Sequence, residues 1–212
     1  MLRICIMEAE EPSQFRDNPP GVTSKLAEAS VGIAGVGGIG SNAAVILARA
    51  GVGRLVLVDH DSVELPNLNR QFYFHGQIGY PKVDALRQTL HQVNPDITLE
   101  THCRMLDRRN ACELFQDCDP LVEAVDGEET KVLLLETWMS GLPGRHVFSC
   151  SGIAGHGDTD LIRVDRRKML TIVGDQASSL SRGTLSSRVA IVAGMMANEI
   201  IEYIIGKDCP VH

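Results

Sequence analysis

A run of glycines near the start of the chain has the spacing of a nucleotide-binding loop. Gly35, Gly37 and Gly40 match G-x-G-x-x-G, with Gly38 between them, and Asp59 ends the next predicted strand. Glycine lets a backbone approach a ligand closely, the amino end of the following helix attracts anionic oxygen, and the acid can accept hydrogen bonds from ribose hydroxyls. The pattern predicts a nucleotide site, and its structural alternative is a tight turn that serves helix packing alone.

Two cations beyond this acid bear on which nucleotide would bind. The glycine pattern alone favours a nicotinamide dehydrogenase. Arg70 and Lys82, however, follow in a polar segment that has no role in hydride transfer, and both could neutralise a triphosphate. Taken singly, Arg70 could be a solvated loop arginine and Lys82 an ordinary lysine of a first helical turn. Their joint occurrence behind a ribose-binding acid favours a triphosphate, which needs cations just beyond the glycine loop.

Four motifs in fixed order resemble the ThiF/MoeB/HesA family of E1-like adenylyltransferases. The family pattern is a GxGGxGS loop, a D-x-D, an NLNRQ-type segment and a G-x-x-K, and this chain has GVGGIGS, DHD, NLNRQ and GYPK. The resemblance covers about residues 25–206. Within the family, residues 123–126, 174–175 and 187–190 most resemble the short branch called ThiF family 2, which is associated with thiamine biosynthesis.

The resemblance implies a role for each motif residue. Gly38 approaches the nucleotide, Asp59 holds the ribose, Lys82 contacts phosphate, and Asn67 and Arg70 contact phosphate or ribose. The nucleotide-binding set implied in this way is Gly35, Gly37, Gly38, Gly40, Asp59, Asp61, Asn67, Asn69, Arg70, Gln71 and Lys82. The implied catalytic set is Arg70, Lys82 and Asp126.

Asp126 is the implied magnesium ligand. The family usually has asparagine after this aspartate, whereas this chain has Gly127. The structural alternative is an aspartate that caps the next helix. The resemblance therefore implies ATP and Mg2+ as cofactors. It implies no zinc, because the two C-x-x-C pairs of the longer relatives are missing.

The implied reaction is the attack of a carboxylate on the α-phosphate of ATP. The carboxylate is the C-terminus of a small ubiquitin-like sulfur-carrier protein, ThiS-like and ending in Gly-Gly, and the products are an acyl-adenylate and pyrophosphate. Three alternatives stay open: an E1-like enzyme that adenylates a small molecule or a modified tRNA base, a non-catalytic carrier-binding protein, and an NAD-dependent oxidoreductase. The sequence also leaves the carrier and the sulfur donor open.

Cysteines and an N-terminal arginine complete the candidate residues. Family members that form a covalent sulfur link use a cysteine before the last helix, but residues 151–208 contain none. Cys150 ends a predicted buried strand and is expected to pack in the core, which favours adenylation without covalent transfer. Relatives also borrow an arginine from a partner subunit. Arg16 is the candidate here, and a solvated arginine of the N-terminal lead-in is the alternative.

Alternating strand and helix patterns predict the fold that positions these residues. Strands are expected at 31–35, 54–58, 97–103, 120–125 and 146–150, and helices at 38–50, 81–93, 110–116 and 128–141. This repeat predicts an α/β fold with a Rossmann-like, doubly wound, mostly parallel sheet. Strands at 160–164 and 169–173 predict an antiparallel C-terminal extension, and a helix at 187–205 closes the chain. We expect a lead-in over residues 1–25 and one adenylation domain over 26–208.

Composition restricts the partners. The formal net charge of −7 and the pI of about 5.5 argue against a generic nucleic-acid binder. Acids interrupt the apolar run near the start, so we expect a cytoplasmic protein with neither a secretion signal nor a membrane span. The last helix has more apolar residues than one stripe needs, which predicts a two-fold homodimer, unless its own sheet and loops cover it. These residues are Met195, Met196, Ile200, Ile201, Ile204 and Ile205.

Overall fold

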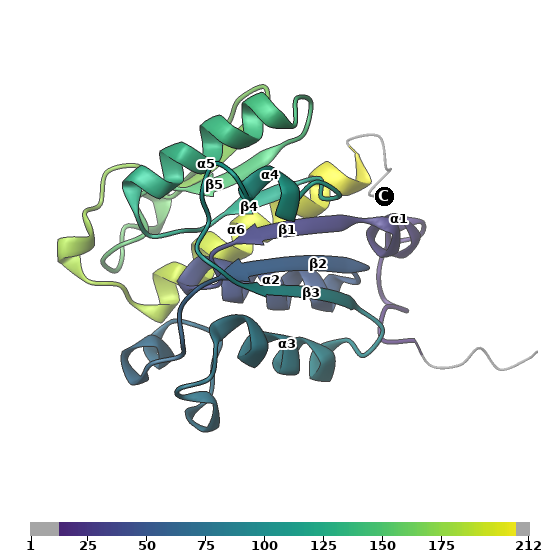
Figure 1. The fold of residues 1–212 in the computed structure, drawn as a ribbon, viewed down its shortest axis with the longest axis horizontal. Helices are drawn as coiled ribbons and strands as arrows, with labels where there is room; N and C mark the ends of the chain where they lie inside the picture. Colours follow the sequence, from purple (N-terminus) through teal and green to yellow (C-terminus); the bar gives the residue numbers. More distant parts are fainter. Residues whose placement is uncertain (1–12, 207–212) are drawn as a thin grey trace, which may run out of the picture.

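The computed structural model describes residues 13–206 and contains a seven-stranded sheet (Figure 1). The strand order is β3-β2-β1-β4-β5-β7-β6, and neighbouring strands are parallel except for the antiparallel pair β6 and β7. The strands are β1 (Ser30–Ala34), β2 (Arg54–Asp59), β3 (Thr98–Cys103), β4 (Leu121–Glu123), β5 (Val147–Cys150), β6 (Arg163–Arg166) and β7 (Leu170–Gly174). The predicted doubly wound sheet with an antiparallel extension is therefore confirmed.

Helices cover both faces of this sheet. They are α1 (Val22–Glu28), α2 (Gly38–Ala50), α3 (Lys82–Val93), α4 (Ala111–Leu114), α5 (Glu128–Gly141) and α6 (Ser186–Ile205). In Figure 1, α4 and α5 lie in front of the strands, whereas α2 and α6 lie behind them. The buried apolar residues form two clusters, one on each face. Along β4, Leu121 joins the cluster under α5 and Val122 joins the larger cluster under α2 and α6.

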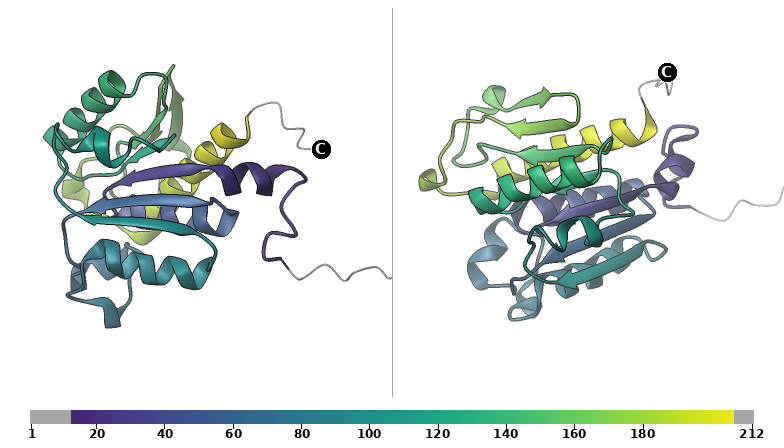
Figure 2. Two further views of the ribbon diagram at one scale, coloured as in Figure 1. Left: turned by 45° about the vertical axis from the view of Figure 1, so that its right-hand side comes forward. Right: turned by 45° about the horizontal axis from the view of Figure 1, so that its top comes forward.

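The strand order reverses between β1 and β4. β1 pairs with β2 on one side and with β4 on the other, which is the point where open α/β sheets bind ligands. Two segments extend beyond the carboxyl ends of these strands, the chain between β2 and α3 and the loop before α6 (Figure 2). The first contains the short 3-10 helices η1 (Leu65–Asn69) and η2 (His75–Gln77). We call the region outside the carboxyl ends of β1, β2 and β4, where the sequence motifs are concentrated, the crevice, after the usual ligand site of open α/β sheets.

The predicted helix 38–50 is α2, and it packs very close to the end of β1. A Cβ on Gly40 would stand 1.9 Å from the backbone oxygen of Gly35, so only glycine permits this approach. The helix ends at Gly51, whose left-handed φ of 103° allows its N–H to cap the last carbonyl groups. Gly40 therefore allows α2 to pack against the end of β1, and Gly51 ends the helix.

Several element boundaries differ from the sequence predictions by a residue or more, and β6 differs most. β6 is Arg163–Arg166 rather than 160–164, and the preceding residues form the 3-10 turn η3 (Thr159–Leu161). Charged residues fit in β6 because it is an outer strand whose side chains reach solvent. The helix α1 lies at the expected junction of lead-in and domain, and its Val22 and Leu26 are buried in the larger core. Spaced four residues apart, these two form one helical face.

The terminal helix α6 belongs to the core of its own chain. Its apolar side chains are fully buried at Met196 and Ile200, and are partly buried against the same cluster at Met195, Ile201, Ile204 and Ile205. This is the alternative in which the chain itself covers the helix, so the apolar excess of α6 gives no separate reason to expect a dimer. Within residues 13–206, we find no helix with both the length and the apolar character needed to cross a bilayer.

Candidate active site

The glycine loop lies at the reversal between β1 and β4. Gly35 has a left-handed φ of 86°, and a Cβ there would stand 2.7 Å from the backbone oxygen of Ala124, so the loops that leave the two strands touch. Gly37 directly precedes α2, and Gly38 is its first residue. The unpaired N–H groups at the amino end of α2 therefore lie at the crevice, where they suit phosphate oxygens.

Asp59 fixes the start of this loop. Its carboxylate oxygens accept hydrogen bonds from the backbone N–H groups of Val36, at 2.8 Å, and Asp61, at 2.9 Å. Each oxygen keeps a second lone pair, so ribose hydroxyls could still donate to the same carboxylate. Asp59 stands at the carboxyl end of β2, beside the glycine loop, which is the position that the sequence predicts.

Lys82 is buried although it opens a helix at the surface. Its ammonium group lies 2.7 Å from Oδ2 of Asp61, and its backbone N–H donates to the backbone oxygen of Asp61 at 2.9 Å. The lysine side chain is 7% exposed, whereas the aspartate side chain is 45% exposed. A buried positive charge is thus held at the crevice by a carboxylate that solvent reaches.

Hydrogen bonds hold the segment between β2 and α3 against the glycine loop. The hydroxyl of Ser41 donates to the backbone oxygen of Gly37 at 2.6 Å and accepts from the N–H of Phe72 at 3.0 Å. The hydroxyl of Tyr73 donates to the backbone oxygen of Val36 at 2.7 Å. Burial raises the pKa of Tyr73, and two nearby carboxylates raise it further, so the hydroxyl keeps the proton that it donates.

Arg70 lies over the amino end of α2. Its backbone oxygen accepts a hydrogen bond from the side chain of Asn42 at 2.9 Å, and a Cβ on Gly38 would stand 3.8 Å from its Cγ. Its guanidinium donates to the backbone oxygen of Pro66 at 3.2 Å and to Oδ1 of Asn69 at 2.8 Å. Both acceptors are uncharged, so they do not offset the positive charge that Arg70 brings to the crevice.

Gln71 has an unsatisfied polar atom at this site, whereas two asparagines are already engaged. Gln71 is buried, and its Oε1 has no hydrogen-bond partner within residues 13–206. Such an orphaned acceptor costs about 1–3 kcal/mol, which a ligand that donates a hydrogen bond would recover. Asn67 accepts from the N–H of Glu64 at 3.0 Å, and Asn69 donates to the backbone oxygen of Thr184 at 3.2 Å. The asparagines therefore shape the segment itself.

Asp126 lies in the loop after β4, which packs against the glycine loop where Ala124 meets Gly35. It is exposed, and none of the described residues donates a hydrogen bond to its carboxylate. A free carboxylate beside a phosphate site is a ligand that Mg2+ prefers. Asp59, His60 and Asp61 also have ligand atoms within 4.8 Å of one another. Both of those carboxylates, however, already hold the groups described above, so Asp126 fits a metal better.

Arg16 is not brought together with the other candidate residues within one chain. Nearby Asn18 donates to the backbone oxygen of Ala50, at the carboxyl end of α2. The glycine loop lies at the other end of this 13-residue helix, about 20 Å away. The exposed guanidinium of Arg16 lies 3.6 Å from the carboxylate of Asp17.

The described cysteines differ in exposure. Cys118 and Cys150 are buried, Cys112 is half-buried, Cys103 is exposed, and all four are free thiols. Burial raises the pKa of Cys150 to about 11, so this thiol stays protonated at neutral pH. Its buried position agrees with the packing role predicted from the sequence.

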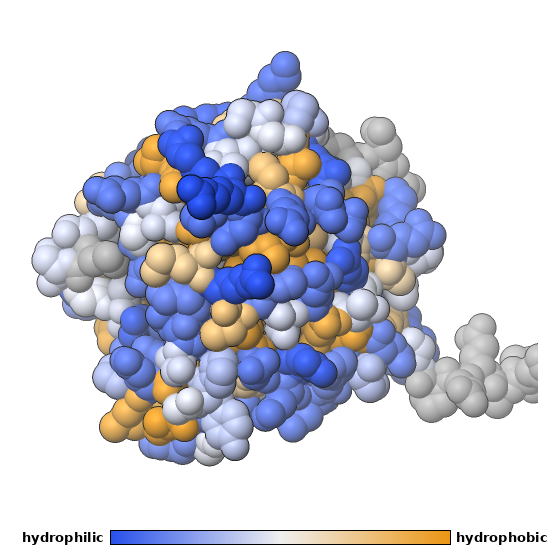
Figure 3. Space-filling model, viewed as in Figure 1, coloured by the Kyte–Doolittle hydropathy of each residue, from blue (hydrophilic) through white to orange (hydrophobic). Residues whose placement is uncertain are grey.

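The outer side of the segment between β2 and α3 is apolar. Four large side chains there are exposed, namely Leu65, Phe74, Ile78 and Tyr80. An orange area at the lower left of Figure 3 lies over this segment. Exposed apolar surface of this kind often marks a contact with another protein.

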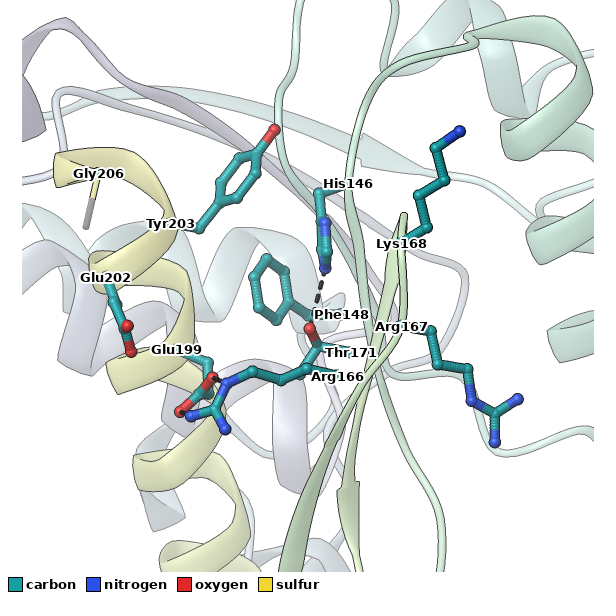
Figure 4. A pocket seen from close by; sticks show the side chains of 10 residues that line it. All are labelled: His146, Phe148, Arg166, Arg167, Lys168, Thr171, Glu199, Glu202, Tyr203 and Gly206. Carbon is teal, nitrogen blue, oxygen red and sulfur yellow. Dashed lines mark hydrogen bonds and ion pairs between the residues drawn. The ribbon is translucent and has the colours of Figure 1, made fainter. Parts of the chain in front are cut away.

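A separate cavity of about 320 Å³ lies at the opposite, amino-terminal end of β5 and β7 (Figure 4). Its lining includes the rings of His146, Phe148 and Tyr203. On one side Arg166 donates two hydrogen bonds of 2.6 Å to Glu199, while Figure 4 shows Arg167 and Lys168 directed away from the cavity. Because Glu199 already pairs with Arg166 and Glu202 adds a second carboxylate to the lining, this cavity suits a nucleotide less well than the crevice does.

Comparison with known proteins gives the family. The model of the ThiF family matches residues 12–212, nearly the whole sequence. The chain belongs to the ThiF family. The recognition of ThiF-type motifs in the sequence is therefore confirmed, and the motif residues that meet at the crevice are those of a ThiF-family protein.

Curated relatives of this ThiF-family chain are longer proteins. Ubiquitin-like modifier-activating enzyme 5 of Oryza sativa subsp. japonica is 30% identical over 212 residues, which cover 85% of this chain and 49% of the relative. Adenylyltransferase and sulfurtransferase MOCS3 of Anopheles gambiae is 42% identical over 111 residues, which cover 52% of this chain and 25% of the relative. The chain thus spans about half or less of the length of these two relatives.

Solved structures share the ThiF-family fold. E. coli tRNA N6-threonylcarbamoyladenosine dehydratase, TcdA, in complex with ATP has a TM-score of 0.81 at 19% identity, covering 91% of this chain and 92% of that chain. E. coli MccB with ATP has a TM-score of 0.67 at 22% identity, covering 87% and 58%. At these identities the likeness establishes the fold alone.

Proposed function

We propose that this ThiF-family chain is an ATP-dependent adenylyltransferase that activates the C-terminal carboxylate of a small ubiquitin-like sulfur-carrier protein. The observation that carries this proposal is the crevice, where β1, β2 and β4 bring a glycine loop, a ribose-type acid, two cations and a free carboxylate to one edge of the sheet. Relatives named as an adenylyltransferase and as ubiquitin-like modifier-activating enzymes support the same class of activity.

Each part of an adenylation step has a counterpart at the crevice. A carboxylate oxygen of the carrier attacks the α-phosphorus, the bond from that phosphorus to the oxygen bridging to the β-phosphate breaks, and pyrophosphate leaves. The N–H groups at the amino end of α2 would bind phosphate oxygens, and Asp59 would accept hydrogen bonds from the ribose hydroxyls. The unsatisfied Oε1 of Gln71 would accept a hydrogen bond from another donor group on ATP. Arg70 and Lys82 would neutralise the charge that pyrophosphate carries away. The buried, protonated Cys150 takes no part.

Asp126 would hold the magnesium ion. When bound, the ion supplies positive charge to the phosphates. The free carboxylate of Asp126 fits this role, while Asp61 would keep Lys82 in place before a nucleotide arrives.

The partners proposed for the chain are a carrier and a second copy of itself. The carrier would be ThiS-like, would end in Gly-Gly and would serve thiamine biosynthesis in the cytoplasm. Within one chain, Arg16 lies at the far end of α2 from the crevice. In the proposed homodimer, Arg16 of one copy would instead contribute to the crevice of the other copy. The exposed apolar side chains beside the crevice support a subunit contact on that side of the molecule.

A second candidate is adenylation of a different substrate, such as a small molecule or a modified tRNA base. It is favoured by the nearly full-length structural match to TcdA, whose name describes a tRNA base dehydratase. The net charge of −7 speaks against tRNA as the substrate. A carrier-binding protein without catalysis is disfavoured because the crevice keeps both cations and both acids.

ATP–pyrophosphate exchange separates these candidates. The chain is incubated with MgATP and labelled pyrophosphate, together with a carrier ending in Gly-Gly, the same carrier lacking its last glycine, unmodified and modified tRNA, or no addition. The proposal predicts exchange that requires magnesium and the intact carrier. Exchange that persists without any carrier would contradict a protein substrate, and exchange that requires tRNA would support the second candidate. Binding of the carrier and ATP without exchange would indicate a non-catalytic role.

A further inference from the structure

Glu123 is a fully buried acid that the adenylation step does not use. It is the last residue of β4 and has no exposed surface. Its strand places it on the α5 face of the sheet, two residues after Leu121, which belongs to the apolar cluster on that face. Burying an ionised carboxylate among apolar side chains is unfavourable unless hydrogen bonds or an ion pair satisfy it. The partners of Glu123 therefore indicate its role.

Three groups from three different elements satisfy the carboxylate of Glu123. The ammonium of Lys131, in the first turns of α5, forms an ion pair with Oε2. The hydroxyl of Ser149 in β5 donates to the same oxygen at 2.6 Å. The backbone N–H of Val125 donates to Oε1 at 3.1 Å. One buried carboxylate thus ties β4 to β5, to α5 and to the loop that begins after β4.

That loop carries Asp126, whose side chain receives no hydrogen bond from the part of the chain that the structure describes. Its location therefore depends on the backbone on either side. Glu123 fixes the backbone on one side through the N–H of Val125 and on the other side through Lys131 of α5. The same loop is set against the glycine loop, because a Cβ on Gly35 would stand 2.7 Å from the backbone oxygen of Ala124.

We propose that Glu123 is a positioning residue that holds Asp126 at the place where it binds the divalent cation of the ATP complex. This inference rests on the proposed function, because it takes Asp126 as the metal ligand. Glu123 itself touches neither nucleotide nor metal. Its loss is expected to weaken binding of the cation in the presence of ATP and to leave metal-free ATP binding unchanged, since the glycine loop and Asp59 stay intact.

The experiment is a titration of Mn2+ into the full chain with ATP, in which free Mn2+ is followed by its electron paramagnetic resonance signal. Glu123→Gln keeps the shape of the side chain and removes its charge. We expect the dissociation constant for Mn2+ to rise roughly tenfold, as for loss of a group that orients a metal ligand. The matched control is Glu199→Gln, which removes a similarly buried, ion-paired glutamate on α6 at the opposite end of the sheet. It should leave the constant within about twofold of the wild-type value.

Further measurements keep the result interpretable. Metal-free ATP binding, followed by calorimetry, should be equal in the wild type and both variants. Ser149→Ala removes one hydrogen bond to the carboxylate without removing its charge, so it should raise the Mn2+ constant in the same direction by a smaller factor. If Glu123→Gln proves unfolded by circular dichroism, Ser149→Ala decides the question. Excess Mg2+ should restore exchange activity to Glu123→Gln, because Asp126 is still present.

The outcomes separate this inference from the proposed function. Equal Mn2+ affinity in folded Glu123→Gln and Glu199→Gln would overturn the positioning role, as would a wild type that binds no Mn2+ with ATP. The titration uses no carrier. A wild type that binds Mn2+ and ATP but catalyses no exchange with any carrier would therefore contradict the proposed substrate while the Mn2+ result for Glu123 still stands.

Discussion

The ammonium group of Lys82 lies 2.7 Å from Oδ2 of Asp61, and the lysine is buried whereas the acid is open to solvent. A buried cation needs a counter-charge, so Asp61 allows the fold to keep Lys82 at the crevice before any ligand binds. Because the acid is exposed, a triphosphate can take its place as the partner of the ammonium group. A nucleotide can thus replace Asp61 as the ionic partner of Lys82.

The first prediction concerns this cation. Lys82→Met keeps an unbranched side chain and removes the charge that would neutralise departing pyrophosphate. We expect carrier-dependent ATP–pyrophosphate exchange to fall roughly 100-fold or more, as for loss of a preorganised electrostatic group. The control is Lys168→Met, which changes an exposed lysine between β6 and β7, away from the crevice. Equal exchange rates in the two variants would contradict the role of Lys82.

Asp126 gives the second prediction. Asp126→Ala should reduce exchange by roughly 100-fold or more even at saturating magnesium, because the proposed metal ligand is lost. The carboxylate is exposed and unbonded within residues 13–206, so the temperature of unfolding should not change. Asp160→Ala, at an exposed aspartate of η3, serves as the control and should keep full activity. Near wild-type turnover in Asp126→Ala would refute the metal role.

The third prediction compares two helical glycines. A Cβ on Gly40 would stand 1.9 Å from the backbone oxygen of Gly35, whereas a Cβ on Gly194 in α6 would meet no atom within 4 Å. Gly40→Ala should therefore lower the free energy of unfolding by about 1–3 kcal/mol through overpacking. Gly194→Ala should raise it by up to about 1 kcal/mol, because alanine is the better helix former. Urea unfolding measures both, and changes of the same sign would contradict the packing described at the glycine loop.

Cysteine reactivity gives the fourth prediction. Burial raises the pKa of Cys150 to about 11, so at pH 8 it has almost no thiolate, and thiolate forms only as the pH approaches that value. Iodoacetamide added to the native chain at pH 8 should modify the exposed Cys103 and leave Cys150 unmodified, as read by peptide mass spectrometry. Cys150→Ala should retain exchange activity. Rapid labelling of Cys150 in the folded chain would argue for a reactive thiol.

The fifth prediction tests whether Arg16 acts between subunits. Light scattering at micromolar concentration should give twice the 23.0 kDa mass of one chain. Arg16→Ala and Lys82→Met should each lose activity as homodimers, but a mixture that exchanges subunits should recover part of it, because one crevice in each hybrid then has both residues intact. A mass near 23.0 kDa, or no recovery in the mixture, would rule out the shared site.

The local spacing of residues predicted much of this molecule. The glycines from Gly35 to Gly40 fix a strand, a turn and a helix within a few residues, so β1, α2 and the crevice follow from the sequence. The hydrogen bonds from Tyr73 to Val36 and from Phe72 to Ser41 were missed, because they join residues more than 30 positions apart, and no periodicity records such pairs. The serine was visible as the end of the GVGGIGS motif, while the tyrosine gave no signal.

Other features could not be predicted because one pattern allows two environments. The apolar residues of α6 are consistent with a core or with an interface, and only the packing against α1 and α2 distinguishes the two. The acid Glu123 follows two apolar residues of β4, and nothing in that run shows that Lys131 and Ser149 would enclose it. The strand expected at 160–164 is β6 at Arg163–Arg166, because the sequence pattern does not show that an outer strand can hold charged residues.

The two outer strands of the sheet determine how copies of this chain can meet. β6 carries charges along its length, and Arg167 beside it pairs with Asp165 at 2.8 Å. On the other edge, Glu100 of β3 bonds to both Arg54 and His102. Charged side chains along an edge make it unfavourable for a foreign strand to add to the sheet. The edges are therefore protected against growth into cross-β aggregates, and any assembly of this chain has to be built from its helices and loops.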